Sequence, residues 1–428
     1  MNISVNELAN TSTANLPREI EIFLAKRVLQ EEDNKDSAVQ SFQDKIGKLG
    51  FNTHKNVINA SGTILHTNLG RAPLNNNAFS RYSNVEFDLN TGARGERNTY
   101  LSTLMQQLLE VEDVAFVNNN ASSLFVTLAN LSKKFSHVIV SRGEIIEIGG
   151  SYRLPEIINE SGLKLIEIGT TNKTRLKDYK NALEEYSDSV VLKVHRSNFS
   201  INGFTEEASI EELSTLKNLF NTVLIHDLGS GLVVSDQFLD KFNLDIFKTE
   251  VTVQSSIKKG SDLVMFSGDK LFGSIQSGVI AGRKDLIEDI KSYSLFRTFR
   301  CSPTVLHALQ ETTEKYVRKS ELDIPFWQLV TETYDNLLNR CNNIIQNISY
   351  KAEAVEGESV IGGGTMPDSI IKSPVIQISE AKSTQLLELF LQNDAPIIPR
   401  IVDNVICLDL RSVFEDQDKV IIDLLSKK

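Results

Sequence analysis

Six short apolar runs, separated by helical segments, dominate the pattern between residues 114 and 266. The runs are Val114–Val117, His137–Val140, Leu165–Ile168, Val190–Val194, Val223–Ile225 and Leu263–Phe266. A strand with one face in water alternates apolar and polar residues, whereas a strand buried on both faces is apolar almost throughout. Because helical stretches such as Ser122–Phe135 lie between the runs, we predict an α/β domain whose mainly parallel sheet is covered on both faces.

The chain has 428 residues, enough for a large domain and one or two smaller ones, since a domain takes roughly 100–200 residues. We predict a helical N-terminal extension at 1–50, a large domain at 51–300 and a small α+β domain at 301–428. In the extension, four apolar residues are spaced as one face of an amphipathic helix. They are Ile20, Phe23, Leu24 and Val28.

The small domain is predicted to begin with a long helix and to end in strands. The residues spaced as one helix face are Phe326, Leu329, Val330, Tyr334, Leu337, Leu338 and Cys341. Gly362–Gly364 then interrupt the pattern, and the strand-like runs Pro374–Ile378 and Val405–Leu410 follow.

The composition is that of a soluble globular chain, with a formal net charge of −11 and 41% hydrophobic residues. The acidic balance argues against a broad nucleic-acid surface, because phosphate binding depends on Lys and Arg. The N-terminus resembles no secretion signal, and no uncharged apolar run approaches the roughly 18 residues of a membrane helix, so we expect a cytoplasmic protein. Cys301, Cys341 and Cys407 are too widely spaced for a metal cluster or a disulfide framework, so we predict reduced, structural cysteines and no metal site.

Two residues that end apolar runs point to a carbonyl cofactor. Lys270 follows the run that ends at Phe266, and an amine placed there can form a Schiff base if its surroundings lower its pKa. Asp227 follows the run Val223–Ile225, and a carboxylate there can keep a pyridine nitrogen protonated. Each residue alone has a plain alternative, a solvated lysine or a helix N-cap, but the pair is stronger evidence.

A third segment predicts a phosphate site. In residues 116–123 an apolar strand passes through small polar residues into a helix, where free N–H groups and the helix dipole attract anions. The order along the chain is phosphate turn, strand-end Asp and strand-end Lys, which is the order found in the large fold of pyridoxal-5′-phosphate (PLP) enzymes.

Several further segments resemble one family, the bacterial L-seryl-tRNA(Sec) selenium transferases, from about residue 57 to the C-terminus. The segments are VINASGTILHTNLGRAPL (57–74), SRGEIIEIGGSYRLPEI (141–157), EIGTTNKTRLKDY (167–179), KVHRSNFSINGFT (193–205), HDLGSG (226–231), FSGDKLFG (266–273) and PRIVDNVICLDLRSV (399–413). The resemblance implies an aspartate-aminotransferase-like fold that binds PLP. It places PLP on Lys270 and Asp227 at the pyridine nitrogen. The residues that it suggests near the phosphate are Asn119, Asn120, Ala121, Ser122 and Ser267.

The resemblance also implies a reaction and its partners. Seryl-tRNA(Sec) would lose its α-proton to Lys270 and then water, leaving a PLP-bound aminoacrylyl group. Selenium from selenophosphate would add at Cβ to give selenocysteinyl-tRNA(Sec), in a homo-oligomer built from dimers, up to a decamer. The family arginines suited to a dianionic donor match Arg94, Arg97, Arg297 and Arg300, with Arg400 as a further candidate for a substrate oxygen.

Four other residues near these motifs have open roles. His66, His195 and His226 can contact the cofactor or be satisfied structural groups, and the two readings are about equally supported. Cys301 follows Arg300, and we interpret it as a small buried residue and not as a selenium carrier.

Two features depart from the family pattern. Residues 1–50 hold six Lys or Arg against eight Asp or Glu, so this possible tRNA contact is not a basic arm. After Arg300 the chain continues with Cys301-Ser302-Pro303 where the family usually has an acid and a lysine.

Two other functions remain open from the sequence. A related PLP lyase acting on a small amino acid or amino sugar acid would use the same Lys and Asp for β-elimination. A non-catalytic protein on a relic PLP scaffold is disfavoured, because both residues are present.

Overall fold

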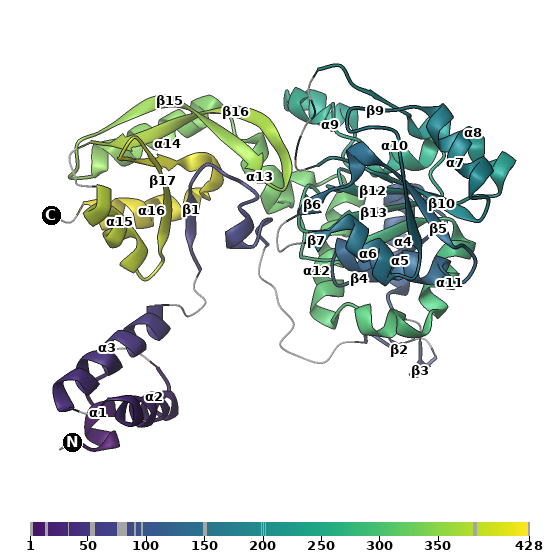
Figure 1. The fold of residues 1–428 in the computed structure, drawn as a ribbon. Helices are drawn as coiled ribbons and strands as arrows, with labels where there is room; N and C mark the ends of the chain where they lie inside the picture. Colours follow the sequence, from purple (N-terminus) through teal and green to yellow (C-terminus); the bar gives the residue numbers. More distant parts are fainter. Residues whose placement is uncertain are drawn as a thin grey trace.

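The computed structural model describes residues 3–12, 16–32, 34–51, 56–74, 84–89, 91–95, 97–148, 152–197, 199, 201, 203–379 and 383–426. Every predicted site residue lies within these ranges. Parts of the quoted segments, at 149–151, 198, 200 and 202, lie outside the described residues. Figure 1 shows a large sheet with its helices beside a smaller sheet with its own helices, and the N-terminal helices standing apart from both.

The large sheet contains all six predicted strands and one that was not predicted. In spatial order the strands are β4 (Asp113–Val117), β14 (Gly278–Gly282), β13 (Leu263–Ser267), β12 (Leu224–Gly229), β10 (Ser189–Val194), β5 (His137–Ser141) and β8 (Lys164–Ile168). Only β14 runs against its neighbours, so the predicted mainly parallel sheet is confirmed. The carboxyl ends of β4, β13, β12 and β10 therefore lie along one edge of the sheet.

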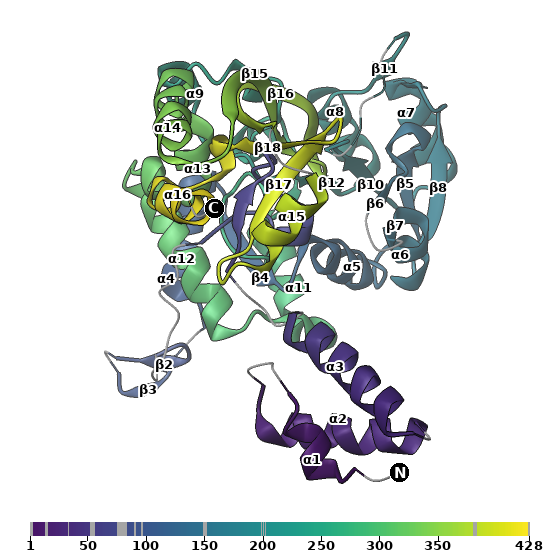
Figure 2. The same ribbon diagram turned by 90° about the vertical axis from the view of Figure 1, so that its left-hand side faces the viewer.

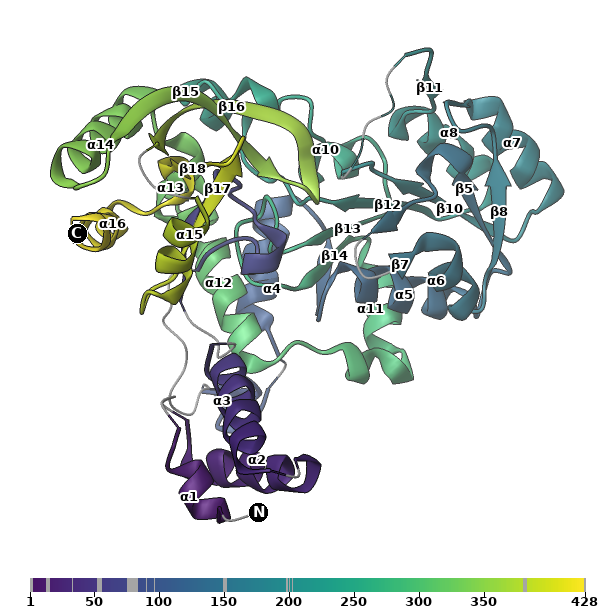
Figure 3. The same ribbon diagram turned by 60° about the vertical axis from the view of Figure 1, so that its left-hand side comes forward.

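Helices cover both faces of this sheet, as expected for strands that are apolar throughout. Figure 3 shows α7 and α8 on one side and α5, α6 and α11 on the other. The covering helices are α5 (Asn120–Leu131), α6 (Leu154–Glu160) and α11 (Lys284–Ser292) on one face and α7 (Leu176–Glu185), α8 (Ile210–Phe220) and α10 (Val253–Lys258) on the other. The predicted helix 122–135 is thus α5, which begins two residues earlier because Asn119 caps it.

Further helices pack around β4, β14 and β13. They are α4 (Thr99–Leu109), α9 (Asp236–Lys241), α12 (Pro303–Val317) and α13 (Pro325–Thr331). Trp327 of α13 is fully buried against Phe238 and Phe247, and its Nε1 donates a hydrogen bond to Tyr316 Oη at 2.7 Å. Figure 2 shows the short ribbon of β2 (Phe87–Asp88) and β3 (Ala93–Arg94) projecting beside α4.

The predicted long helix over 326–341 is wrong, because the chain forms two helices there. α13 ends at Thr331 and α14 (Tyr334–Asn347) begins after Glu332 and Thr333, which are both extended. The Thr333 side chain accepts a hydrogen bond from Asn336 N and so caps a new helix. The apolar spacing continues across the break, but α13 and α14 bury their apolar residues in two different cores. The spacing alone therefore does not reveal that the helix ends.

The small sheet contains five strands, of which two were predicted in part. Their order is β1 (Ile58–Ala60), β17 (Ile397–Val402), β18 (Val405–Asp409), β16 (Thr365–Ile378) and β15 (Ala352–Gly362). α14, α15 (Ser383–Gln392) and α16 (Asp418–Leu425) pack on it around Phe390 and Cys341, both fully buried. Gly363 and Gly364 form the turn between β15 and β16, so the predicted interruption is a hairpin.

The predicted domain limits at 51 and 301 remain a prediction, and the packing suggests other positions. β1 pairs with β17 and so lies in the small sheet, although the chain leads from it into the large domain. α12 and α13 pack in the core that also contains Phe116 and Phe266. We propose that residues 57–61 belong to the small domain and that its continuous part begins near residue 333.

The N-terminal segment forms three helices with a small core of their own. They are α1 (Val5–Ala9), α2 (Arg18–Glu31) and α3 (Lys35–Phe51), joined around Val28, Phe42 and Ile46. Of the predicted apolar face only Val28 is buried, whereas Ile20 and Phe23 are exposed. The prediction of that face was therefore wrong, because α2 is apolar around much of its circumference and contact with its neighbours decides which side is buried.

Candidate functional site

The predicted cofactor residues meet at the edge where the parallel strands end. Lys270 lies in the turn after β13, and Asp227 lies near the end of β12. Between them is Gly229, where an added Cβ would lie 3.7 Å from Lys270 Nζ and 3.2 Å from Ser197 Oγ. Gly229 has a φ of +65°, which L side chains rarely adopt, so a glycine leaves this space open to the amine.

A bulge in β12 helps to orient the Asp227 side chain. Asp227 pairs with Met265, but the next pairing on β13 joins Phe266 to Gly229, so the register skips one residue. Gly229 N then donates a hydrogen bond of 3.1 Å back to Asp227 Oδ1. The carboxylate is only 8% exposed, and it faces α5 while its neighbour His226 faces the opposite side of the sheet.

Asn120 provides the second hydrogen bond to this carboxylate. Its Nδ2 donates to Asp227 Oδ1 at 2.7 Å, from the first turn of α5. Burial raises the pKa of Asp227, while the hydrogen bond from Asn120 and the charge of Lys270 oppose that effect only in part. A proton is therefore favoured near this carboxylate, and a ring nitrogen beside it could share that proton.

We expect Asn120→Ala to raise the pKa of Asp227 further, because it removes a donor that stabilises the carboxylate. As the pH falls, the carboxylate should then be lost at a higher pH than in the wild type. Binding of PLP, followed by absorbance across a pH series, should weaken by about tenfold at the acidic end, the effect of one hydrogen bond to a charged group. Asn130→Ala, at the other end of α5, should leave the pH dependence unchanged.

Lys270 is held among charged groups of both signs. Burial and the nearby Arg71 guanidinium lower the pKa of Lys270, while Asp227, Asp269 and Glu250 raise it to a smaller extent. The net result is a lysine whose neutral amine is more populated at neutral pH than that of an ordinary lysine. A nucleophile or general base needs this property.

Arg71 and Asp269 were not among the predicted site residues, although both lie in the quoted segments. Arg71 Nη1 lies 2.7 Å from Asp269 Oδ2, and Ala72 N donates to Asp269 O at 3.3 Å. The segment after β1 thus packs against the lysine turn. The sequence signal was the position of Asp269 immediately before Lys270, but its partner is 198 residues away and could not be inferred from spacing.

The predicted phosphate turn is the N-terminus of α5. Asn119 uses its side chain as the N-cap and accepts a hydrogen bond of 2.9 Å from Ser122 N. The first N–H groups of a helix lack partners within the helix, so Asn120 and Ala121 lie where an anion would bind. Ser267 is the last residue of β13, whose neighbour β14 packs against this turn through Gly278. The structure therefore brings the predicted phosphate residues to the same edge as Lys270.

The predicted arginines lie elsewhere. Arg94 and Arg97 both pair with Glu86, at 2.9 and 3.5 Å, and Arg97 Nη2 also donates to Cys301 O at 2.8 Å. Arg97 and Arg300 line a pocket of about 570 Å³, and none of the cofactor residues line it. Arg297 is exposed on the same segment as Arg300, and this segment reaches the phosphate turn through a hydrogen bond from Asn118 N to Phe299 O.

Arg400 is held within the small sheet. Its Nη1 donates to Glu358 O at 2.6 Å, and its Nη2 lies 3.6 Å from Asp409 Oδ2. Asp409 is fully buried and also accepts hydrogen bonds from Ser359 Oγ and Ser373 Oγ. Contact between Arg400 and a substrate stays a prediction, and its observed partners give it a structural role.

The histidines and Cys301 have different surroundings. His226 is buried and bonds to Ser256 Oγ at 2.8 Å, and burial lowers the pKa of His226 well below its usual value, so it is a neutral structural group. His195 Nε2 lies 3.0 Å from Glu250 Oε1, at the sheet edge. His66 Nδ1 is buried without a partner among the described residues. Burial raises the pKa of the Cys301 thiol to about 12, which agrees with the plain structural interpretation.

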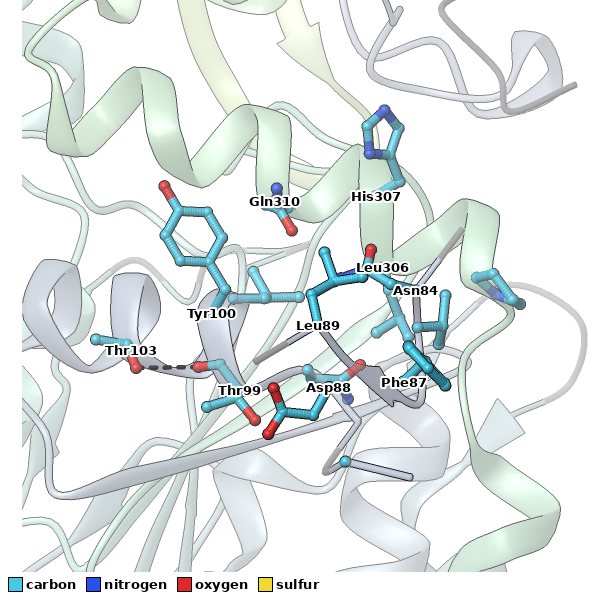
Figure 4. Close-up of a pocket in the computed structure, with 15 residues that line it drawn as sticks. Asn84, Phe87, Asp88, Leu89, Thr99, Tyr100, Thr103, Leu306, His307 and Gln310 are labelled. Carbon is cyan, nitrogen blue, oxygen red and sulfur yellow. Dashed lines mark hydrogen bonds between the residues drawn. The ribbon is translucent and has the colours of Figure 1, made fainter. Parts of the chain in front are cut away.

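A cavity of about 1000 Å³ lies away from this edge. Figure 4 shows its lining, with Tyr100 and Thr103 from α4 and His307 and Gln310 from α12. None of the predicted site residues line it. Its size alone therefore does not identify the candidate site.

A family model described as L-seryl-tRNA selenium transferase matches residues 57–414. The L-seryl-tRNA(Sec) selenium transferase of Aliarcobacter butzleri (strain RM4018) is 37% identical over 98% of this chain and 95% of its own length. That of Clostridium perfringens (strain 13 / Type A) is 37% identical over 94% of this chain and 90% of its own length. The match to the first relative must include most of residues 1–50.

Among solved structures, D-glucosaminate-6-phosphate ammonia-lyase is similar in fold. It has a TM-score of 0.59 and 18% identity, covering 89% of this chain and 96% of the lyase chain. At this identity the likeness concerns the fold alone. Within the part of the chain that the structure describes, no helix combines the length and the apolar character needed to cross a membrane.

Proposed function

Because this chain belongs to the L-seryl-tRNA selenium transferase family, we propose that it converts seryl-tRNA(Sec) to selenocysteinyl-tRNA(Sec), with PLP as cofactor and selenophosphate as selenium donor. The observation that carries the chemistry is the meeting of a lysine amine and a buried carboxylate, from two different strands, beside Gly229. The fold implied by the resemblance, that of the aspartate-aminotransferase-like PLP enzymes, is confirmed by the sheet order and by the structural likeness.

The residues at the sheet edge fit PLP in three respects. Lys270 offers an amine with a lowered pKa, and Asp227 offers a buried carboxylate for a pyridine nitrogen. The N-terminus of α5 offers N–H groups for a phosphate. Buried Asn120 Oδ1 and Asp269 Oδ1 have no partner among the described residues, as expected of a site made for a polar ligand.

Each group at the edge then has a role. When bound, PLP supplies a carbonyl carbon that amines attack and a ring that draws electrons from Cα. Asp227 holds the ring nitrogen protonated, and Asn120 orients Asp227. Lys270, once its amine is free, takes the α-proton of the serine at Nζ, a step made easier by its lowered pKa. Arg71 holds Asp269, the residue next to Lys270, in place.

The finer steps of the proposal concern the serine side chain. Loss of the α-proton and of the hydroxyl as water leaves an aminoacrylyl group on the tRNA. Selenium from selenophosphate would then add at its Cβ while water cleaves the P–Se bond, so that phosphate leaves and Cα takes up a proton. The donor carries a dianionic phosphate, for which Arg97 and Arg300 in their shared pocket are the best-placed pair.

We propose a homo-oligomer built from dimers, and the position of this arginine pair supports that proposal. Within one chain, the pocket that contains Arg97 and Arg300 has no cofactor residue in its lining, so we propose that a second copy brings the arginines to the cofactor edge. Light scattering of the purified protein should give a mass at least twice that of one chain.

The test is the visible absorption spectrum of the purified protein with PLP, recorded before and after adding seryl-tRNA(Sec) or free serine. We expect a band that changes with the tRNA and not with serine. A band that responds only to small amino acids would support the alternative lyase function, and the absence of any band would contradict the cofactor.

The N-terminal helices separate the same two functions. Removing residues 1–50 should leave the visible band intact, because α1–α3 have their own core and contribute no cofactor residue. Turnover of seryl-tRNA should fall if these helices bind tRNA, whereas a lyase for small molecules should keep its activity. A truncated protein that still processes seryl-tRNA at the full rate would exclude a role for this segment.

A further inference from the structure

Glu250 is a buried carboxylate that no sequence motif singled out. It lies in the loop between the short turn Asp245–Phe247 and α10, and its side chain is 8% exposed. A buried carboxylate needs partners, because burying an unpaired charge costs several kcal/mol. The hydrogen-bond partners of Glu250 indicate the role of its carboxylate.

The partners of Glu250 come from the two strand ends that form the cofactor edge. Glu250 Oε1 lies 3.0 Å from His195 Nε2 and accepts a hydrogen bond of 2.5 Å from Ser230 Oγ. His195 follows β10, and its backbone N donates to Asp227 O at 2.8 Å. Ser230 follows β12, and its carbonyl accepts a hydrogen bond of 3.0 Å from Leu271 N, next to Lys270. One carboxylate thus joins the segments that carry Asp227 and Lys270.

The charge of Glu250 also acts on the site. Burial raises the pKa of Glu250, but the hydrogen bonds and charge of His195, the hydrogen bond from Ser230 and the charge of Lys270 outweigh it, so the pKa is lowered overall. The carboxylate is therefore ionised at neutral pH. Among the charged groups near Lys270, Arg71 lowers its pKa, whereas Asp227, Asp269 and Glu250 raise it.

We propose that Glu250 is a positioning residue for the Lys270 site: it holds the His195 imidazole by its Nε2–H and supplies a negative charge that acts on Lys270. The inference rests on the proposed cofactor site and deepens it. A histidine held at Nε2 keeps Nδ1 as its second polar atom, an acceptor when neutral and a donor when protonated. Nδ1 can then form a hydrogen bond with a cofactor or substrate oxygen at the sheet edge, just as the second ring nitrogen of a carboxylate-bound histidine does in other enzymes.

The first test needs no cofactor. Nitrogen NMR of protein labelled in histidine reports which ring nitrogen carries the proton, and the His195 signal is identified by its loss in His195→Asn. We expect His195 to carry its proton at Nε2 in the wild type and to lose this preference in Glu250→Gln, since an amide can also donate. A His195 spectrum that does not change in Glu250→Gln would overturn the proposal, whatever the cofactor does.

The second test uses the enzyme loaded with PLP. In Glu250→Gln the pH at which the visible band titrates should move downward, because a charge that raises the pKa of Lys270 is removed. The kcat should fall by roughly tenfold, the effect of one lost hydrogen bond to a charged group, with little change in KM for seryl-tRNA. Glu250→Asp should restore the titration in part. If kcat and the titration match the wild type, Glu250 has no positioning role.

A matched control is available in Glu144, another buried carboxylate. It pairs with Lys193 at 2.8 Å and accepts a hydrogen bond from Val194 N, but it is not among the charges that act on Lys270. Glu144→Gln should lower the melting temperature without moving the band titration. If both variants lower only the melting temperature, Glu250 is structural. If the wild type itself shows no band with PLP, the proposed function fails, and the NMR result still decides the role of Glu250.

Discussion

Lys270→Ala should remove the visible band of the protein with PLP and reduce turnover of seryl-tRNA by at least about 100-fold, the lower range for the loss of a general base. The loss should exceed that range because the same amine also binds the cofactor carbon. Alanine cannot supply either function, and Lys270 is the lysine whose charge opposes the raised pKa of Asp227. The measurements are the absorption spectrum and single-turnover rates at saturating tRNA.

A surface lysine provides the control for this substitution. Lys180, on α7, is exposed and forms an i,i+4 ion pair with Glu184 at 3.8 Å, so Lys180→Ala should keep both the band and the rate. Added methylamine would be expected to restore part of the rate of Lys270→Ala, because it replaces the missing amine. A Lys270→Ala protein with a normal band would mean that another residue binds the cofactor.

Gly278→Ala should destabilise the protein by about 3 kcal/mol, the upper end for overpacking a core, and should weaken PLP binding as well. A Cβ on Gly278 would lie 2.2 Å from Asn119 O and 2.2 Å from Ser123 Oγ, which is far inside van der Waals contact. Asn119 O is a backbone atom at the N-terminus of α5, so it can move only if the phosphate turn moves. The side chain of this alanine would therefore displace the groups that we expect to hold the phosphate.

Urea unfolding and titration with PLP measure the two effects separately. Gly363→Ala is the matched control, because a Cβ there would meet no atom within 4 Å. If Gly278→Ala lowers stability but leaves PLP affinity unchanged, then the α5 turn does not hold the phosphate. If it changes neither, the close packing of β14 against α5 is not maintained in solution.

Much of the fold could be predicted from the sequence, because its signals are local. Six strands were identified from apolar runs, since a strand buried on both faces cannot carry polar side chains on either. The position of Lys270 and Asp227 at strand ends followed from the same runs. Once strands are parallel, their carboxyl ends share an edge, so these two residues had to lie at the same edge, and the pairing of β12 with β13 brings them close together.

The strand β14 was missed for a physical reason. Its sequence, Gly278–Gly282, is bounded by glycines and has only three apolar residues, which is too short to distinguish from a turn. The glycines are needed because Asn119 O and Asp262 O approach within 2.2 Å of where a Cβ would be. Gly278 and Asn119 are more than 100 positions apart in the chain. A pattern of neighbouring residues cannot predict a close approach of this kind.

Only the tertiary structure decided which side chains contact the residues of the candidate site. The sequence by itself predicted the residues that we propose bear the chemistry, Lys270 and Asp227, because residue type and strand period can be recognised from consecutive positions. Only the folded chain decided that Asn120 bonds to Asp227, that Glu250 holds His195, and that Arg97 and Arg300 line a separate pocket. These contacts join different elements, and side chains meet across elements through packing of the whole core, which the spacing of residues along one strand or helix does not specify.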